Sequence, residues 1–348
     1  MTWSDIDVIL PNLKRQLSGV TSTVLRLVPV QGRQIGLAVV GWPLPGIAVR
    51  PLRQAFGVPR DRWRVWHARR NNEMVLGLIL RHVFRRKFRL LFTSAAQRVH
   101  TGFTKALIAR QDAVVATSEK AARYLDRPAT VIMHGVDTDI FTPAADRAAL
   151  RTELGLPVDG CIIGCFGRVR AQKGVDLLVD AALALCPARP DLHIVFSGRV
   201  AAKHRAFHEA LQAKIAAAGL SGRITFRGEV SWADLVRLHQ AMDLYVAPSR
   251  TEGFGLTPLE AMACGTPVVA SDAGAYAEMV EPGLGTIVPP GDAGALTAAL
   301  AAWVDDPARR AAARPACRRH VLDRFAIARE AEALIAVYRQ MLAEPARG

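Results

Sequence analysis

Two glutamates, Glu252 and Glu260, lie eight positions apart in the second half of the chain. The segment Gly253-Phe254-Gly255-Leu256-Thr257 between them predicts a turn followed by the start of a short helix, with Pro258 in its first turn. The N–H groups at a helix start have no helical partner, so they can bind phosphate or sugar oxygens. Glu252 is placed for hydrogen bonds to vicinal hydroxyl groups. Glutamates that only complement the helix dipole would account for Glu260, but not for the two glycines.

Two cations follow an earlier apolar strand, in Phe166-Gly167-Arg168-Val169-Arg170-Ala171-Gln172-Lys173-Gly174. In an open parallel sheet, ligands bind outside the carboxyl ends of the strands. Arg168 and Lys173 would therefore reach the crevice and could hold a diphosphate without a metal ion. Gly198 and Val230 follow two further strands, where a flat base could approach the backbone. The alternatives are surface charge at a strand end and ordinary turn chemistry.

Short apolar strands alternate with helical patterns along the whole chain, which predicts parallel sheets covered on both faces. Two such halves predict an α/β protein with two doubly wound, Rossmann-like domains, residues 1–150 and 151–320. The expected strands are 6–10, 35–40, 64–67, 90–93, 113–117, 130–133, 161–166, 192–196, 224–227, 244–247, 267–270 and 286–288, with helices including 71–84 and 97–109.

The last segment, Arg318 to Leu342, predicts one long amphipathic helix. No strand follows this helix, so residues 321–348 must pack on a sheet that is already built. The apolar face of the helix repeats at helical spacing and comprises Ile327, Ala331, Leu334, Tyr338 and Leu342.

The composition is that of an ordinary globular protein, with 51% hydrophobic and 22% charged residues among 348. The sequence contains no uninterrupted run of about 18 apolar residues, so we expect no membrane-spanning helix. Acids precede the first apolar run, which is wrong for a secretory signal. The five cysteines show no paired metal spacing, so we expect reduced, mostly buried thiols in a cytosolic protein.

The net charge of +14 is concentrated in one stretch. Between residues 60 and 110 only Asp61 and Glu73 oppose thirteen basic residues, with Trp63 and Trp66 interleaved. This pattern favours an anionic partner such as a membrane surface, a phosphorylated glycan or nucleic acid, over a merely solvated face. The thirteen are Arg60, Arg62, Arg64, Arg69, Arg70, Arg81, Arg85, Arg86, Lys87, Arg89, Arg98, Lys105 and Arg110.

Together, FGRVRAQKG at residues 166–174 and RGEVSWADLVRLHQAMDLYVAPSRTEGFGLTPLEAMACGTPVVASD at residues 227–272 resemble the family 4 retaining glycosyltransferases of the GT-B fold. HGVDTDIFTP, residues 134–143, resembles that family's linker motif. The resemblance implies two domains facing across a cleft, the first for the acceptor and the second for a nucleotide-sugar donor. It implies that the terminal helix crosses back to the first domain. It also implies that Arg168 and Lys173 hold the diphosphate, Glu252 the transferred sugar and Glu260 the ribose.

The first half resembles, more narrowly, the mannosyltransferases of lipopolysaccharide core assembly, in RVWHARRN (64–71) and LFTSAAQR (91–98). That likeness implies GDP-mannose as donor and an acidic inner-core glycolipid of the Kdo-lipid A type as acceptor. His67, Arg69, Arg70 and Arg98 are the acceptor-binding candidates, and His67 is also a catalytic candidate beside Glu252, Arg168 and Lys173. Such an enzyme would be cytoplasmic and peripheral on the inner face of the cell membrane.

The chain departs from the family pattern at three places. The first loop, Ser18-Gly19-Val20, has a single glycine where many members have two, although Gly19 remains a donor-binding candidate. Ser94 and Ala95 stand where many members have a sugar-contacting histidine, so that role is absent or passes to His67 or His100. His134 replaces the usual asparagine of the linker.

Retention of configuration would ordinarily suggest a carboxylate nucleophile, but Glu252 is placed for hydroxyl groups. The resemblance implies front-side attack, with Arg168 and Lys173 stabilising the departing phosphate. No Asp-x-Asp stands at the diphosphate, since Asp137-Thr138-Asp139 lies in the linker, so we expect no metal or other cofactor. A UDP-hexose donor remains an alternative. A basic nucleic-acid-binding protein lacks a recognition motif here, and a dehydrogenase lacks G-x-G-x-x-G after its first strand.

Overall fold

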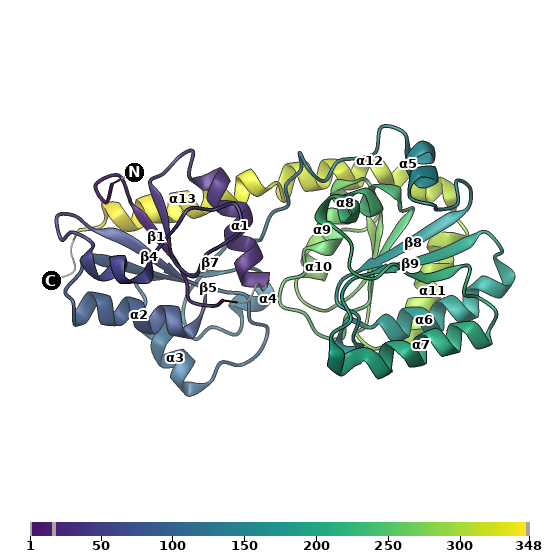
Figure 1. Cartoon of the computed structure of the whole chain (residues 1–348), viewed down its shortest axis with the longest axis horizontal. Helices are drawn as coiled ribbons and strands as arrows, with labels where there is room; N and C mark the ends of the chain where they lie inside the picture. The colour runs from purple at the N-terminus through teal and green to yellow at the C-terminus, as the bar shows by residue number, and fades with distance from the viewer. Residues whose placement is uncertain (1, 16–18, 346–348) are drawn as a thin grey trace. The chain divides into compact units, whose positions relative to one another are not determined.

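The computed structural model describes residues 2–15 and 19–345, which form two compact units (Figure 1). Unit 1 comprises Met1–Gly135 and Ile327–Gly348, and unit 2 comprises Val136–Ala326. The first boundary lies 15 residues before the predicted one. The reason is that helix α5 (Arg147–Glu153) packs against α8 (Trp232–Ala241) of unit 2. Its buried Arg151 also donates a 2.5 Å hydrogen bond to Asp243.

Unit 1 is built on a fully parallel seven-stranded sheet in the order β3-β2-β1-β4-β5-β6-β7. The six predicted strands are present within a few residues of their expected bounds. Strand β3 was not predicted, because it is only two residues long. The strands are β1 (Val8–Asn12), β2 (Leu37–Gly41), β3 (Val49–Arg50), β4 (Arg64–Ala68), β5 (Phe88–Ser94), β6 (Ala113–Ala116) and β7 (Thr130–Val131).

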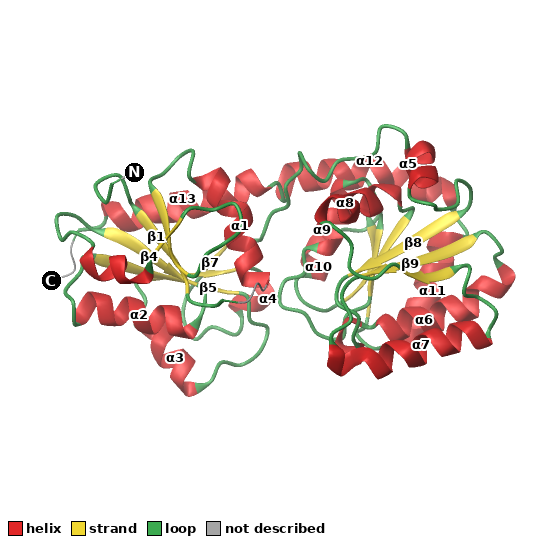
Figure 2. Ribbon diagram, viewed as in Figure 1, coloured by secondary structure: helices red, strands yellow, loops and turns green. Residues whose placement is uncertain are grey.

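Helices cover both faces of this sheet (Figure 2). Helices α1 (Gly19–Gln31) and α13 (Ile327–Ala343) pack on one face, and α2 (Asn71–His82) and α3 (Gly102–Ala109) pack on the other. The predicted helix from residue 97 begins at Gly102, because the Thr101 side chain caps it by accepting from the Thr104 N–H at 3.3 Å. The short elements are the 3₁₀ helix η1 (Leu52–Gly57) and α4 (Glu119–Ala122).

The predicted terminal helix is two helices. Helix α12 (Pro307–Arg324) belongs to unit 2, and α13 belongs to unit 1. Phe325 breaks the helix between them, with φ −129° and ψ 18°. In α13 the predicted apolar residues Ile327, Ala331, Leu334 and Tyr338 are buried, and the helix packs on α1 and β4. The prediction that the terminal helix packs on the first domain is thus confirmed.

Unit 2 has a six-stranded parallel sheet in the order β10-β9-β8-β11-β12-β13. All six strands were predicted. They are β8 (Cys161–Phe166), β9 (Leu192–Ser197), β10 (Ile224–Phe226), β11 (Leu244–Ala247), β12 (Val268–Ser271) and β13 (Gly285–Val288). The remaining helices of unit 2 are α6 (Val175–Leu185), α7 (Arg205–Ala217), α9 (Thr257–Ala263), α10 (Tyr276–Met279) and α11 (Ala293–Val304). Its 3₁₀ turns are η2 (Ala171–Lys173), η3 (Cys186–Ala188) and η4 (Ala202–His204).

Both sheets follow the Rossmann strand order, in which the chain crosses back after its third strand and places the fourth strand on the free side of the first. In unit 2 this switch lies between the neighbouring strands β8 and β11. A doubly wound sheet binds its ligand outside the carboxyl ends of the strands at such a switch. The fold therefore places the loops after Phe166 and Ala247 where a ligand site is expected. All five cysteines are buried and free, as predicted.

Candidate donor site and the cavity of unit 1

The loops after β8 and β11 bring the predicted donor residues of unit 2 together. After β8 the chain passes through Gly167 and Arg168 to a 3₁₀ turn that ends at Lys173. After β11 it passes through Ser249 to Glu252 and then to α9. Lys173 Nζ forms an ion pair with Glu252 Oε2, and both side chains are about four-fifths buried. A cation and a carboxylate from the two loops therefore meet at the switch point.

Tyr276, in the first turn of α10, is part of the same arrangement. Its hydroxyl donates to Glu252 Oε2 at 3.5 Å, while Glu252 Oε1 accepts from the Gly253 N–H at 3.2 Å. Burial raises the pKa of Tyr276 well above its usual range, and the charge of Glu252 adds to the effect. The phenol is therefore a proton donor that helps to orient Glu252. The sequence carried no signal for this residue.

Two glycines allow the loops to approach closely. Gly255 has φ +85°, and a Cβ there would lie 2.3 Å from the ring of Tyr276. Gly174 has φ +66°, and a Cβ there would lie 1.9 Å from the carbonyl oxygen of Pro248. Both positions combine a left-handed backbone with a close neighbour, so a side chain would displace the loops. The glycine at 255 is thereby explained as a packing requirement of the site.

Two adjoining cavities open at this end of the sheet. The smaller, about 20 Å³, is lined by Arg168, Lys173, Thr257 and Tyr276 among others. The larger, about 260 Å³, is lined by residues that include the predicted Gly198 and Val230. Gly167, Arg168, Phe166 and Thr257 border both cavities. The cations Arg168 and Lys173 border the smaller cavity, and Arg168 also borders the larger one beside Gly198.

Arg170 is a further cation in the loop after β8, although it lines neither cavity. Burial and the charge of Arg168 lower its pKa, while the charge of Glu252 raises it. Arg170 therefore lies within the electrostatic influence of both predicted site residues. In the sequence it stands between Arg168 and Lys173 in the same motif.

Glu260 lies deeper than the sequence analysis expected. Its side chain is largely buried on α9, and Oε2 lies 3.7 Å from Nε2 of the buried His239. His239 packs against the rings of Phe141, Phe166 and Tyr245, and burial lowers its pKa to about 3. Glu260 is absent from the lining of both cavities, and the ring of Phe254 is likewise buried. Gly253, Gly255 and Leu256 remain partly exposed.

Unit 1 contains its own cavity, of about 350 Å³, at the ends of β4 and β5. Its lining includes the predicted acceptor residues Arg69 and Arg98, together with Ser94, His100 and His134. Arg70 is outside the lining and pairs with Glu73 at 2.6 Å. The structure thus brings two of the four acceptor candidates into one cavity.

His67 does not fit the role predicted for it. Its side chain is fully buried, with Nδ1 2.7 Å from the Tyr338 hydroxyl and Nε2 2.7 Å from Thr93 Oγ1. Burial, reinforced by the charge of Arg69, holds its pKa well below the usual range. A neutral imidazole with both nitrogens engaged ties β4 to β5 and α13. The prediction of a substrate-contacting His67 is therefore wrong for this structure.

His100 is the better of the two histidine candidates considered for the missing position. It lines the cavity of unit 1, and its Nε2 lies 3.4 Å from Ser94 Oγ. Partial burial and the charge of Arg98 lower its pKa.

In the first loop, Gly19 begins α1 and is exposed, whereas Ser18 lies outside the described residues.

Asp137 of the linker accepts hydrogen bonds from the backbone N–H groups of Asp139 and Ile140, at 3.0 and 3.2 Å. It therefore shapes a local turn. Among the described residues, no three His, Cys, Asp or Glu side chains gather in a way that could hold a metal ion.

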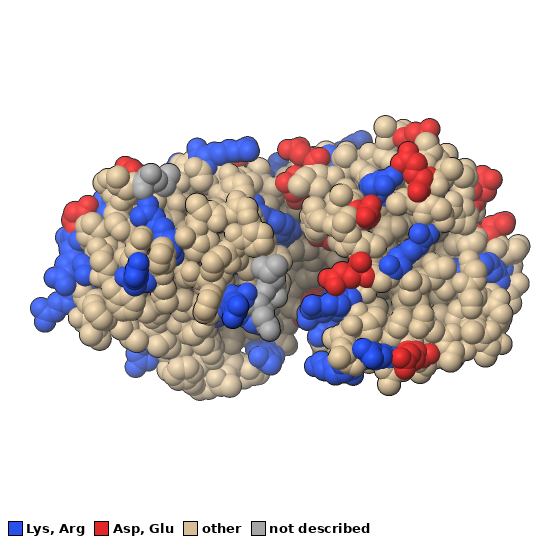
Figure 3. Space-filling view, in the orientation of Figure 1, with Lys and Arg blue, Asp and Glu red and all other residues tan. Residues whose placement is uncertain are grey.

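The basic stretch of residues 60–110 is only partly a surface feature. Arg64 and Arg89 are both buried. Arg64 forms an ion pair with Asp61 at 2.8 Å, and Arg89 donates to the carbonyl oxygen of Pro345 at 2.7 Å. Arg81 pairs with Asp112 at 2.6 Å. Lys and Arg side chains nevertheless gather at the end of unit 1 on the left of Figure 3. The exposed members include Arg60, Arg85, Lys87, Arg98 and Arg110.

Two Rossmann-like units, with cations and a carboxylate at the switch point of the second, define a GT-B glycosyltransferase. The sequence model described as "Glycosyl transferases group 1" matches residues 146–320, and the chain belongs to this family. HepE of Anabaena, solved in complex with UDP, superposes with a TM-score of 0.84 over 96% of this chain and 100% of that chain, at 20% identity.

Two full-length relatives are similar in sequence as well. The lipopolysaccharide core biosynthesis mannosyltransferase LpcC of Rhizobium leguminosarum bv. viciae is 51% identical over 98% of each chain. The mannosyltransferase LpsB of Rhizobium meliloti (strain 1021), of the same description, is 48% identical over 97% of this chain and 98% of the relative. Both relatives match unit 1 as well as unit 2.

Proposed function

We propose that this protein transfers mannose from GDP-mannose, with retention of configuration, to the acidic inner core of a lipopolysaccharide precursor. The observation that carries the proposal is the meeting of Lys173 and Glu252 at the switch point of unit 2, beside Arg168. The two relatives described as lipopolysaccharide core mannosyltransferases support the choice of sugar and acceptor.

In the proposed reaction, Arg168 and Lys173 bind the diphosphate and stabilise the negative charge that grows on it as the glycosidic C–O bond breaks. Glu252, oriented by Tyr276, binds a hydroxyl group of the sugar. The acceptor hydroxyl attacks from the face that the phosphate leaves, and its proton passes to a phosphate oxygen. This route needs no protein nucleophile and no metal ion, because two or more cationic side chains offset the diphosphate charge.

The donor base is tested by thermal shift with GDP, UDP, ADP and their sugars. A ligand present at a hundred times its Kd stabilises the protein by about 2.7 kcal/mol, which gives a readable rise in Tm. We expect GDP and GDP-mannose to give the largest rise. A larger rise with UDP and UDP-glucose would replace GDP-mannose with a UDP-hexose; HepE, of similar fold, was solved with UDP. No rise with any nucleotide would contradict a glycosyltransferase donor site.

The cavity of unit 1 supports an acidic acceptor. Arg69 and Arg98 supply positive charge there, and hydroxyl and imidazole groups line the rest. Transfer of labelled mannose to a Kdo-containing acceptor, compared with a neutral acceptor of the same size, tests this part. Equal transfer to both would contradict charge recognition.

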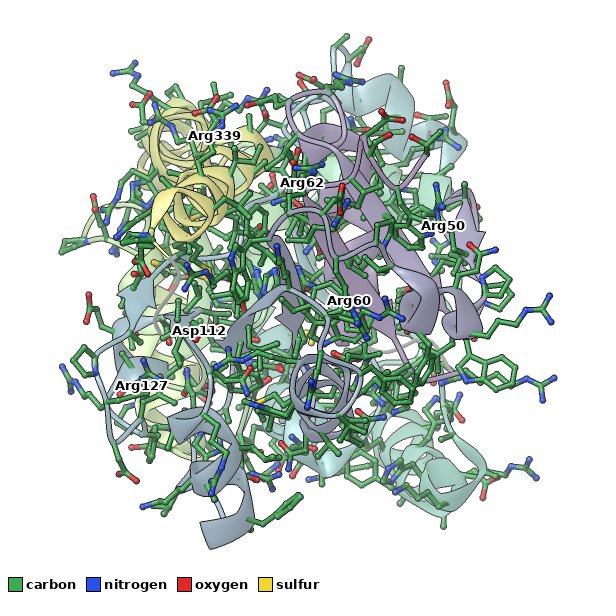
Figure 4. All side chains as sticks on the ribbon, turned by 90° about the vertical axis from the view of Figure 1, so that its left-hand side faces the viewer. Arg50, Arg60, Arg62, Asp112, Arg127 and Arg339 are labelled. Carbon is green, nitrogen blue, oxygen red and sulfur yellow. The ribbon has the colours of Figure 1, made fainter. Side chains whose placement is uncertain are left out.

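We also propose that unit 1 rests on an anionic membrane surface through the end of α2. There Val83 is 70% exposed, next to the exposed Phe84, Arg85 and Lys87. Arg60 donates to the carbonyl of Phe84 at 2.9 Å, and Figure 4 shows Arg60 on the same face as Arg50 and Arg62. None of the described helices combines the length and the apolarity that a crossing of the bilayer requires.

Such a surface combines apolar side chains for the interface with cations for anionic lipid. Vesicles with anionic lipid should bind the protein at low salt and release it at high salt. Replacing Arg85 and Lys87 by glutamate should weaken binding, whereas Lys203→Glu in η4 of unit 2 should not. Equal binding to neutral vesicles, or no effect of the double replacement, would contradict this placement.

A further inference from the structure

His134 and Glu330 form a pair that no role assigned so far requires. His134 follows β7, and Glu330 lies in the first turn of α13, 196 residues later in the chain and within the same unit. His134 Nδ1 lies 2.6 Å from Glu330 Oε1, and Glu330 Oε2 accepts from the Gly135 N–H at 2.7 Å. Glu330 is only 4% exposed. One buried carboxylate thus fixes both the imidazole and the backbone beside it.

The imidazole of His134 also lines the 350 Å³ cavity of unit 1. A ring whose Nδ1 is held by a carboxylate keeps a set orientation, so the part of the ring that lines the cavity is presented to a ligand in that orientation. A buried carboxylate that orients a histidine in this way is the arrangement that proteins use when the other nitrogen must meet a ligand in a set orientation.

The rest of the lining indicates what the cavity takes. Arg69 and Arg98 supply two positive charges, and Thr23, Asn71 and His100 add neutral polar groups. None of the residues that line this cavity within the described chain is an aspartate or glutamate. Cations together with hydroxyl, amide and imidazole groups match a ligand that carries both a carboxylate or phosphate and hydroxyl groups.

We propose that His134 contacts the acceptor sugar in this cavity and that Glu330 is the positioning residue that fixes its ring. The inference rests on the proposed function, because it takes the acceptor to be an acidic sugar. The imidazole would offer the sugar a polar ring held in one orientation, beside the positive charges of Arg69 and Arg98.

The test separates a ligand contact from a structural role through the two Michaelis constants. His134→Asn keeps a short polar donor near Glu330 and removes the reach of the ring into the cavity. We expect the KM for a soluble Kdo acceptor to rise roughly ten- to a hundredfold, as for the loss of a hydrogen bond to a charged group. The KM for GDP-mannose should stay within about twofold, and Tm should change by no more than about 4 °C.

Glu330→Gln tests the positioning role. A glutamine oxygen can accept from only one of the two N–H groups, and its NH₂ group faces the other, so either the imidazole loses its present tautomer or the backbone of Gly135 beside it loses its hydrogen bond. The acceptor KM should rise as in His134→Asn, and the double variant should be no worse than the single ones, since both remove the same contact. The matched controls are Glu332→Gln, exposed on the same helix, and His82→Asn, exposed at the end of α2.

A wild-type enzyme that transfers mannose, with an unchanged acceptor KM in His134→Asn, would overturn the inference and leave the proposed function standing. If no nucleotide sugar supports transfer, the proposed function fails, and calorimetry with free Kdo decides the inference. Weaker binding of Kdo by His134→Asn than by the wild type would then support it. Equal binding, or no binding by the wild type, would overturn it.

Discussion

Lys173 and Glu252 form an ion pair across the ends of two neighbouring parallel strands, although 79 residues separate them in sequence. The pair links the residue proposed to bind the diphosphate with the residue proposed to bind the sugar. A donor that places its phosphate at Lys173 therefore competes with Glu252 for the same ammonium group. The two residues should therefore respond differently to substitution.

Lys173→Ala should lower kcat by on the order of 10²–10³-fold, because the growing charge on the departing phosphate loses a cation that is already in place. Nucleotide affinity should fall as well, since the unpaired Glu252 then repels the diphosphate. Initial rates and nucleotide titration measure both effects. Lys214→Ala is the matched control, because Lys214 pairs with Asp180 on an exposed surface of the same unit. Near wild-type turnover in Lys173→Ala or Arg168→Ala would make the assignment wrong.

Glu252→Gln should lower turnover roughly ten- to a hundredfold through loss of a charged hydrogen bond to the sugar, while the fold survives. Affinity for the free nucleoside diphosphate should be equal or higher, because Lys173 loses its competing carboxylate. Isothermal titration with GDP and a rate assay separate the two effects. Glu209→Gln, exposed on α7, controls for the charge change. If nucleotide affinity and turnover fell together, Glu252 would be acting on the phosphate side instead.

The sequence predicted the two sheets because buried parallel strands are apolar runs with helices between them, a pattern that local composition preserves. It also predicted that Arg168, Lys173 and Glu252 lie together, because each stands at a strand end near a glycine turn. The break at Phe325 escaped prediction, since the amphipathic pattern continues on both sides of it. His67 was misassigned because its partner Tyr338 lies 271 residues away in sequence. Burial of that kind depends on tertiary packing that no local pattern records.

Gly255→Ala should abolish nucleotide binding for two reasons. The added Cβ would clash with the ring of Tyr276, and the positive φ of this position is unfavourable for alanine. Gly291→Ala is a close control, since Gly291 has φ +82° and no atom within 4 Å of its added Cβ. We expect Gly291→Ala to cost about 1 kcal/mol of stability, as for a left-handed backbone alone, and to keep nucleotide binding. Fluorescence titration with GDP measures the difference. Equal behaviour of both variants would show that the contact with Tyr276 is unimportant.

Stability should fall as the pH drops below 6.5, because His67 and His239 are neutral in the folded protein. Burial holds the pKa of His67 well below its usual range and lowers that of His239 to about 3. In the unfolded chain a histidine takes up a proton near pH 6.5. The unfolded state therefore binds more protons between pH 6.5 and the folded-state pKa, and each residue can contribute up to about 1.4 kcal/mol of lost stability per pH unit.

Urea unfolding between pH 7.5 and 5 should show this slope. His239→Leu should reduce the slope even if it lowers stability at pH 7.5. Leucine binds no proton, so the unfolded state no longer gains one at this position as the pH falls. His82→Leu, at an exposed position of α2, controls for the removal of a histidine and should leave the slope unchanged. An unchanged slope in His239→Leu would mean that His239 is protonated in the folded protein, with Glu260 at 3.7 Å as the group that stabilises its charge.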